Sequence, residues 1–149
     1  MKISTKGRYG LRAVLDISLH EGEGPVTINN IAGRQQLSER YLEQLLITLK
    51  QNGLIKSIRG FQGGYILAKE PRLIKVGDIV RALEGPLAPV DCVNEDKLGE
   101  CSRTEACVTK IVWEDLRDAI TQVLDSYTIE DLILESQKMQ ENSFDNYSI

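Results

Sequence analysis

The chain has 149 residues, of which 42% are apolar and 27% are charged, and its formal net charge is −4. This composition is that of a globular protein, and the length allows one domain with its own core plus an added arm. The polar start MKISTKGRYG lacks the apolar stretch of a signal peptide, and no segment reaches the ~20 apolar residues of a membrane span. We therefore expect a cytoplasmic protein without a membrane partner.

The charge is divided unevenly between the two halves of the chain. Residues 1–75 contain twelve Lys and Arg against six Asp and Glu, a net charge of +6, whereas residues 76–149 contain six against sixteen, a net charge of −10. A basic first half favours a polyanion such as nucleic acid as its partner. Chance patchiness of a solvated surface gives the same pattern, so the charge needs support from the order of the elements.

The first half begins with three predicted helices. Helical periodicity predicts the first over Thr5–His20 and a short second one over Thr27–Gln35, with Thr27 as its N-cap. After a turn at residues 36–37, Ser38 caps a longer helix that extends to about Asn52. One face of this third helix is an apolar stripe of leucines, which leaves the opposite face polar.

A hairpin and a further helix follow. Two β-prone segments, 54–58 and 65–67, flank a glycine-rich tip at 59–64 and predict a two-stranded hairpin. Val76–Glu84 is predicted to be a short helix, and residues 86–108 lack periodicity and are predicted to be a loop.

The second half ends in two predicted helices. The first extends from about Thr109 to Ser126, and the next opens at Thr128–Asp131, which resembles a capping box, and ends near Gln140. The polar tail after Glu141 is expected to be frayed. The long helix carries a continuous apolar stripe with too little of the first domain left to cover it, which indicates a dimer interface. The members of the stripe are Val112, Trp113, Leu116, Ile120, Val123, Leu124 and Tyr127.

The order helix, short helix, turn, longer helix and hairpin is that of a winged helix-turn-helix. In such folds the second helix of the motif lies in the DNA major groove, with its N-terminal residues at the base edges. Glu43 can accept a hydrogen bond from cytosine and Gln44 can pair with adenine, whereas Lys50, Lys56 and Arg40 suit phosphates. A solvated helix face is the plainer explanation for each residue alone, and the joint order of the elements favours DNA.

The hairpin tip and the first helix complete this prediction. Glycines let the tip backbone approach a sugar–phosphate chain, and Arg59 can enter a narrow minor groove. An ordinary hairpin turn is the plainer explanation for the tip. The candidate DNA-binding residues are Arg8, Tyr9, Ser38, Glu39, Arg40, Tyr41, Glu43, Gln44, Arg59, Gly60, Gly63 and Gly64.

The three cysteines, Cys92, Cys101 and Cys107, all lie in the loop predicted over residues 86–108. An odd number argues against a disulfide framework, and the gaps of eight and five residues, without a CxxC pair, suit a zinc ribbon poorly. They fit ligands of a larger iron–sulfur cluster, and they fit equally well three unligated thiols. An enzyme or redox protein is disfavoured because no nucleophile–base pair accompanies the cysteines.

Four segments, STKGRYGLRA, LSERYLEQLL, LKQNGLIKSIRGFQGGYIL and VGDIVRALEGP, closely resemble the bacterial Rrf2 family of winged-helix regulators, which has IscR, NsrR and CymR branches. The resemblance extends through nearly the whole chain. It implies that SERYLEQ and RGFQGGY contact double-stranded DNA and that the helix at 109–126 holds a homodimer.

The resemblance also bears on the cysteines, because the IscR and NsrR branches hold an iron–sulfur cluster with three loop cysteines and CymR-type members lack them. This sequence departs from the pattern by a three-residue insertion within VNEDKLGE, by Lys110 where the IscR branch has histidine, and by Arg8 where the NsrR branch has an acid. The fourth ligand and the choice between two and four irons stay open. The candidate fourth ligands are Asp91, Ser102, Glu105, a water and a small thiol.

The sequence thus predicts a mostly α fold with a small β wing, divided into a winged helix-turn-helix domain at 1–85, a cluster loop at 86–108 and dimerisation helices at 109–149. The predicted function is a homodimeric repressor or dual regulator of iron–sulfur or cysteine and sulfur metabolism genes, switched by the cluster. The alternative is a cluster-free, CymR-like regulator controlled by a protein partner such as cysteine synthase. We expect no enzymatic activity.

Overall fold

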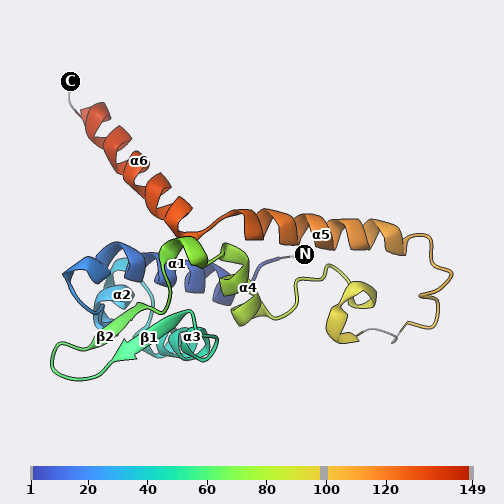
Figure 1. Cartoon of the computed structure of the whole chain (residues 1–149), viewed down its shortest axis with the longest axis horizontal. Helices are drawn as coiled ribbons and strands as arrows, with labels where there is room; N and C mark the ends of the chain where they lie inside the picture. Colours follow the sequence, from blue (N-terminus) through green and yellow to red (C-terminus); the bar gives the residue numbers. More distant parts are fainter. Residues whose placement is uncertain (1, 98–100, 148–149) are drawn as a thin grey trace.

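The computed structural model describes residues 2–97 and 101–147 and shows a helical unit with a small hairpin, from which two long helices extend (Figure 1). The larger elements are α1 (Thr5–His20), α2 (Ile28–Gln35), α3 (Glu39–Gln51), β1 (Ile55–Ile58), β2 (Gly64–Leu67), α4 (Val76–Glu84), α5 (Lys110–Ser126) and α6 (Ile129–Tyr147). The short 3₁₀ turns are η1 (Glu21–Glu23), η2 (Pro71–Leu73), η3 (Asp91–Val93) and η4 (Glu95–Lys97). The predicted mostly α fold with a β wing is confirmed.

The core lies between α1, α2, α3, α4 and the hairpin. Apolar residues spaced three or four apart turn one side of each helix inward, where removal of that surface from water stabilises the unit. Ile129, the first residue of α6, is fully buried in the same core, so the chain returns to this unit after α5. Fully buried members from the other elements are Ala13, Val14, Ile17, Ile31, Leu42, Leu46, Leu49, Ile55, Ile74 and Ile79.

Side-chain caps set the starts of the first three helices. The hydroxyl of Thr27 accepts from the N–H of Asn30, and the hydroxyl of Ser38 accepts from the N–H of Tyr41. Between α2 and α3, Gln36 adopts a left-handed conformation with φ of 57°, which makes the tight turn of the helix-turn-helix. The predicted caps and turn are therefore confirmed.

The hairpin is a two-stranded antiparallel sheet that pairs Ile55 with Leu67 at its base and Ile58 with Gly64 near its tip. The backbone of Val26, which precedes α2, exchanges two hydrogen bonds with Tyr65 at 2.9 and 2.8 Å. This contact attaches the wing to the helix-turn-helix, so the two parts that we expect to contact DNA are held in a fixed relation.

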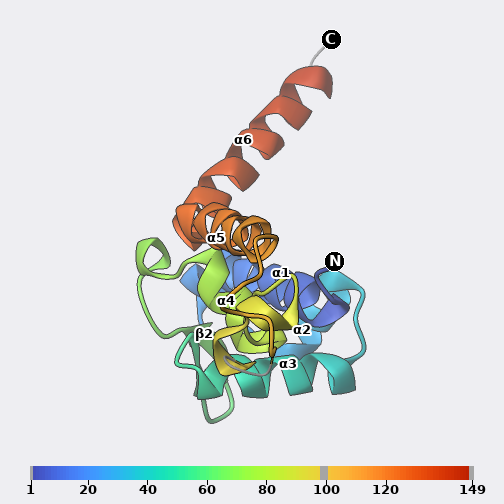
Figure 2. The same ribbon diagram turned by 90° about the vertical axis from the view of Figure 1, so that its right-hand side faces the viewer.

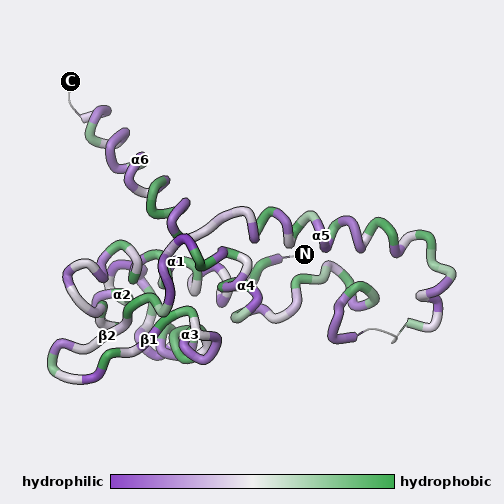
Figure 3. Tube along the Cα trace, viewed as in Figure 1, coloured by the Kyte–Doolittle hydropathy of each residue, from purple (hydrophilic) through white to green (hydrophobic). Residues whose placement is uncertain are grey.

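Helices α5 and α6 make few core contacts. α5 crosses above the unit, on the side opposite to α3 and the hairpin, and α6 projects away from it (Figures 1 and 2). None of the residues of α5 is buried, and Ile129 is the one buried residue of the described part of α6. Hydrophobic segments recur along α5 (Figure 3), and its exposed apolar side chains are Ile111, Val112, Trp113, Val123 and, just after the helix, Tyr127.

Two expectations for the second half are corrected. The last helix continues to Tyr147 instead of ending near Gln140, since neither glycine nor proline occurs after Ser136 to interrupt it, and the expected frayed tail over 141–147 is helical. Within the loop predicted over 86–108, two short turns, η3 and η4, form.

The capping box predicted at the start of the last helix is present: Thr128 and Asp131 make its reciprocal hydrogen bonds, at 2.9 and 3.2 Å. In the described residues, no helix has both the length and the apolar character that crossing a bilayer requires.

Candidate DNA-binding face and cysteine loop

The outer face of α3 is polar and exposed. Leu42, Leu45 and Leu46 turn inward, with at most 2% of their surface exposed. The opposite side chains, Glu39, Arg40, Glu43 and Gln44, are all exposed at the N-terminal half of the helix. This is the arrangement that a recognition helix needs, because its core contacts leave these side chains available to base edges.

Glu39 and Glu43 differ in their surroundings. The amide of Asn29 on α2 donates a 2.7 Å hydrogen bond to Glu39, which holds that carboxylate across the turn of the motif. Within the described residues, Glu43 makes no side-chain hydrogen bond or ion pair. Glu43 is therefore free to accept a hydrogen bond from outside the chain.

An aromatic and cationic cluster joins α1 to the start of α3. The rings of Tyr9 and Tyr41 meet edge to face with centroids 6.2 Å apart, and the Tyr41 hydroxyl lies 3.1 Å from that of Thr5. The guanidinium groups of Arg8 and Arg12 lie 5.7 and 5.3 Å from the centre of the Tyr9 ring. Arg8, Tyr9 and Tyr41, which the sequence predicts as DNA-binding residues, thus belong to one surface.

An ion pair between the buried Asp16 of α1 and the exposed Arg34 of α2 joins the two helices, and the sequence analysis did not predict it. Asp16 is 3% exposed and receives hydrogen bonds from the Arg34 guanidinium at 2.7 and 3.0 Å and from the Gln35 amide at 2.8 Å. The hydrogen bond to Asp16 raises the pKa of Arg34 above its ordinary value, so the guanidinium stays charged. His20, at the end of α1, contacts the backbone carbonyl of Asp16 at 2.8 Å.

The wing tip exposes one cation and one aromatic ring. Arg59 is exposed, and Phe61, which was not among the predicted DNA-binding residues, is exposed over its whole surface. The signal was available, since Phe61 lies at the tip of a two-stranded hairpin, away from the helices that form the core. The close approach of neighbouring backbone requires glycine at positions 63 and 64. A Cβ on Gly63 would lie 2.3 Å from the carbonyl oxygen of Ile58, and a Cβ on Gly64 would lie 2.6 Å from that of Val26.

Two of the three cysteines share a pocket. Cys92, in η3, and Cys101 line a cavity of about 420 Å³ together with Asp91 and Ser102. Of the proposed fourth ligands, Asp91 and Ser102 therefore lie at the thiols, whereas Glu105 does not line this cavity. The insertion predicted within VNEDKLGE falls partly on residues 98–100, which lie outside the described residues. Among those described, three potential ligands do not converge on one point.

Cys107 lies outside that cavity and has a separate environment. Its sulfur is 3.2 Å from the Thr109 hydroxyl, at the start of α5. Hydrogen bonds from the Thr109 hydroxyl and the Lys110 backbone lower the pKa of the Cys107 thiol, because they stabilise the thiolate. The thiolate is the form that ligates metals, so this environment suits a ligand, provided that the loop moves Cys107 towards the other two. Lys110 itself pairs with Glu114 at 3.5 Å.

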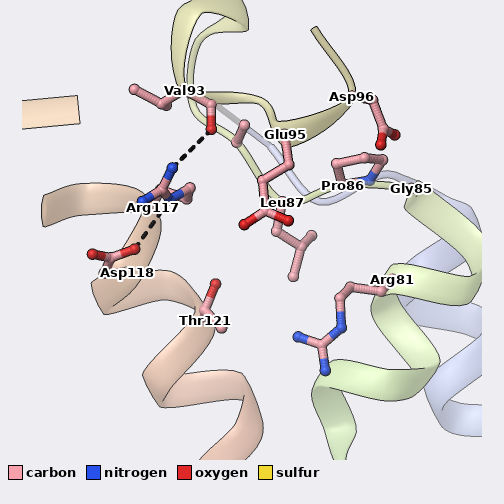
Figure 4. Close-up of a pocket in the computed structure, with 11 residues that line it drawn as sticks. Arg81, Gly85, Pro86, Leu87, Val93, Glu95, Asp96, Arg117, Asp118 and Thr121 are labelled. Carbon is pink, nitrogen blue, oxygen red and sulfur yellow. Dashed lines mark hydrogen bonds and ion pairs between the residues drawn. The ribbon is translucent and has the colours of Figure 1, made fainter. Parts of the chain in front are cut away.

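An arginine of α5 contacts the segment that carries Cys92. A cavity of about 430 Å³ lies between the end of α4, the loop and α5. Figure 4 shows Arg117 reaching from α5 to the loop. Arg117 donates a 3.1 Å hydrogen bond to the carbonyl of Val93, the residue after Cys92, and Val93 is itself 1% exposed. The segment that carries Cys92 is therefore fixed to α5.

The far end of α5 is attached to the first domain. Arg81 of α4 donates to Asp125 at 2.7 Å and to Asp78 at 3.2 Å, and these carboxylates raise its pKa. Backbone hydrogen bonds of 2.9 Å join Val76 to Tyr127 and Ile129 to Ile74. The C-terminal end of α5 is therefore joined to α4 and to the segment that precedes it.

Comparison with known proteins agrees with this architecture. The family model Rrf2, described as an iron-dependent transcriptional regulator, matches residues 3–135. The chain belongs to the Rrf2 family. This Rrf2 chain is 48% identical to the transcriptional regulator CymR of Bacillus subtilis over 132 residues, 89% of each protein.

Solved structures extend the match to three dimensions. The structure of B. subtilis CymR, described as a global cysteine regulator, superposes with a TM-score of 0.72 at 47% identity, over 89% of this chain and 95% of that one. The structure of T. potens IscR does so with a TM-score of 0.74 at 47% identity, over 94% and 91%. This Rrf2 chain is accordingly a transcriptional regulator of the CymR and IscR type, which is a non-enzymatic role, as expected.

Proposed function

We propose that this Rrf2 regulator is a homodimer that binds operator DNA through α3 and the wing, and whose DNA binding is modulated by an iron–sulfur cluster held by Cys92, Cys101 and Cys107. The proposed division of labour is DNA binding by residues 1–85, cluster binding by the loop at 86–108 and dimerisation by residues 109–149, in the cytoplasm. The observation that carries the DNA-binding part is the exposed polar face of α3 beside the exposed wing tip. The proposed target genes are those of iron–sulfur or cysteine and sulfur metabolism, which rests on the names of the relatives.

The homodimer is supported by the surface of α5. Its exposed apolar side chains are 36–58% accessible and lie towards the two ends of a helix that has no buried residue. Leu116 and Ile120, between them, are half-buried. Exposed apolar surface along a helix marks interaction sites, and burying it against a second copy would remove it from water.

The cluster is supported by the pocket that Cys92 and Cys101 share, by the lowered pKa of Cys107 and by the family description as iron-dependent. When bound, such a cluster supplies anionic charge and a site that oxidants or loss of iron can alter. In this proposal the chain's own contacts transmit cluster binding to the DNA-binding unit. Arg117 ties the segment of Cys92 to α5, and Arg81 ties α5 to α4, so gathering the cysteines biases the position of the DNA-binding unit.

Protein purified without oxygen tests this proposal. We expect a brown protein that contains iron and acid-labile sulfide, and whose affinity for operator DNA changes when the iron is removed. A colourless protein with three freely titrating thiols would contradict the cluster.

A second candidate is a cluster-free regulator controlled by a protein partner such as cysteine synthase. The observations that favour it are the 48% identity to CymR and the lack of convergence of the three thiols among the described residues. Colourless anaerobic protein whose operator binding responds to added cysteine synthase would support this candidate.

A further inference from the structure

A basic groove lies beside the wing, outside the recognition face described above. It is a cavity of about 660 Å³ between the end of α3, strand β1 and the segment after β2. Its polar lining consists of Lys50, Lys56, Ser57, Arg59 and Lys69, and no acidic residue lines it. The chain reaches this arrangement because Gly53, with φ of +71°, turns the backbone from α3 back along β1.

The cations of the groove are not neutralised within the chain. Over residues 2–97 and 101–147, Lys50, Lys56, Arg59 and Lys69 make no ion pair, whereas Arg34, Arg72 and Arg81 each pair with a carboxylate. Lys50 is held across the groove by a neutral partner, because its amino group donates a 2.7 Å hydrogen bond to the Ser57 hydroxyl. Like charges gathered around one hollow repel one another, and an anion placed among them would relieve that repulsion.

We propose that this groove seats phosphate groups of the DNA strand that flanks the segment read by α3. The proposal rests on the proposed DNA-binding function and extends it by naming Lys69 and the groove as a backbone contact. Arg59 belongs both to the groove and to the wing, so a duplex held by the wing passes beside the groove. Lysine amino groups are typical donors to phosphate oxygens, and such contacts fix the position of a protein on the duplex without reading its sequence.

The test is the salt dependence of DNA binding by the full-length protein. Lys69→Gln removes one cation at an exposed position after β2, where no core contact is lost. Each phosphate contact contributes about 0.9 to the slope of log K against log salt, so we expect a slope smaller by about one. The affinity should fall by a similar factor for operator DNA and for a duplex of unrelated sequence, with the ratio between them unchanged.

The matched control is Lys138→Gln, the same charge change on the exposed part of α6. It should leave the slope unchanged. The double variant Lys50→Gln with Lys69→Gln should lose about two from the slope, because each removes a separate contact. Lys69→Gln could instead show the same slope and affinity as the control Lys138→Gln, while the unaltered protein still binds its operator. That result would exclude phosphate binding in the groove and leave the proposed DNA-binding function standing. An unaltered protein that bound no duplex at low salt would contradict the proposed function itself.

Discussion

At the scale of single residues, the two carboxylates of α3 are chemically equal, but the fold places them in different surroundings. Glu39 is held by Asn29, whereas Glu43 on the same exposed face has no partner in the described part of the chain. A carboxylate that faces a polyanion weakens binding unless it meets a donor such as the amino group of cytosine. Glu43 is therefore expected to select sequence rather than to add affinity.

We predict that Glu43→Ala binds unrelated DNA as tightly as the unaltered protein or more tightly. At one base pair of the operator it should lose ~1–3 kcal/mol of discrimination, the value of one base contact. Competition between single-base operator variants measures this loss. Glu130→Ala, which removes an exposed acid of α6, is the control. Full sequence preference in Glu43→Ala would show that this residue does not read a base.

Phe61 is the second residue for which a specific role is expected. An apolar side chain that is wholly exposed at a wing tip contributes nothing to the core and is available to a groove wall or a base step. We predict that Phe61→Ser leaves the thermal unfolding midpoint unchanged and weakens DNA binding by about 1 kcal/mol, the scale of a partly buried apolar side chain. Unchanged affinity, measured by fluorescence anisotropy, would place Phe61 outside the DNA contact.

At the scale of elements, α5 combines two attachments with an apolar stripe that the chain covers only in part. We predict that replacing Leu116 and Ile120 together by Asp prevents dimer formation, since each uncompensated charge in an apolar interface costs several kcal/mol. Analytical ultracentrifugation should show monomers or aggregates. A dimer as stable as that of the unaltered protein would require an interface elsewhere.

Arg117 is the element-scale contact whose loss should separate cluster binding from signalling. Arg117→Ala leaves all three thiols in place, so we expect the protein to keep its iron and its absorption spectrum. The difference in operator affinity between cluster-loaded and cluster-free protein should shrink, because the hydrogen bond from α5 to the Val93 carbonyl is lost. Coupling between sites is typically about 1–3 kcal/mol, and most of it should disappear.

The control for Arg117 is Asp118→Ala, which removes the exposed carboxylate that lies 3.0 Å from the same guanidinium and leaves the Val93 contact intact. It should respond to the cluster as the unaltered protein does. If Arg117→Ala responded equally well, signal transmission would not pass through this arginine.

At the scale of the whole molecule, the core and the cysteine loop are separate. The core cluster belongs to the winged-helix unit and the first turn of α6. Among the described residues of the loop, Val93 is the one that is buried, and it is not part of that cluster. We predict that Cys92→Ala, Cys101→Ala and Cys107→Ala each lose most of the iron yet remain folded and dimeric. Iron analysis, circular dichroism and sedimentation check these outcomes. Unfolding upon iron loss, as in a zinc finger, would mean that the cluster is structural.

The sequence by itself determined the helices, their caps and the hairpin. Ser38 and Thr27 cap the helices expected of them, and Thr128 pairs with Asp131, because each of these hydrogen bonds joins residues three apart. The leucines of α3 indicated which side chains stay outside, since a helix that buries one stripe must expose the other. The candidate residues on α3 could therefore be named without a structure.

Only the tertiary structure decided the contacts between distant segments. Asp16 meets Arg34, Arg117 meets Val93, and Arg81 meets Asp125 across 18, 24 and 44 positions of sequence. The tertiary structure likewise brings Cys92 and Cys101 to the same cavity, and Lys69 to the basic groove. Local periodicity carries no information on such pairs, because they depend on how the helices and the hairpin pack, and packing is settled by the whole set of buried side chains at once.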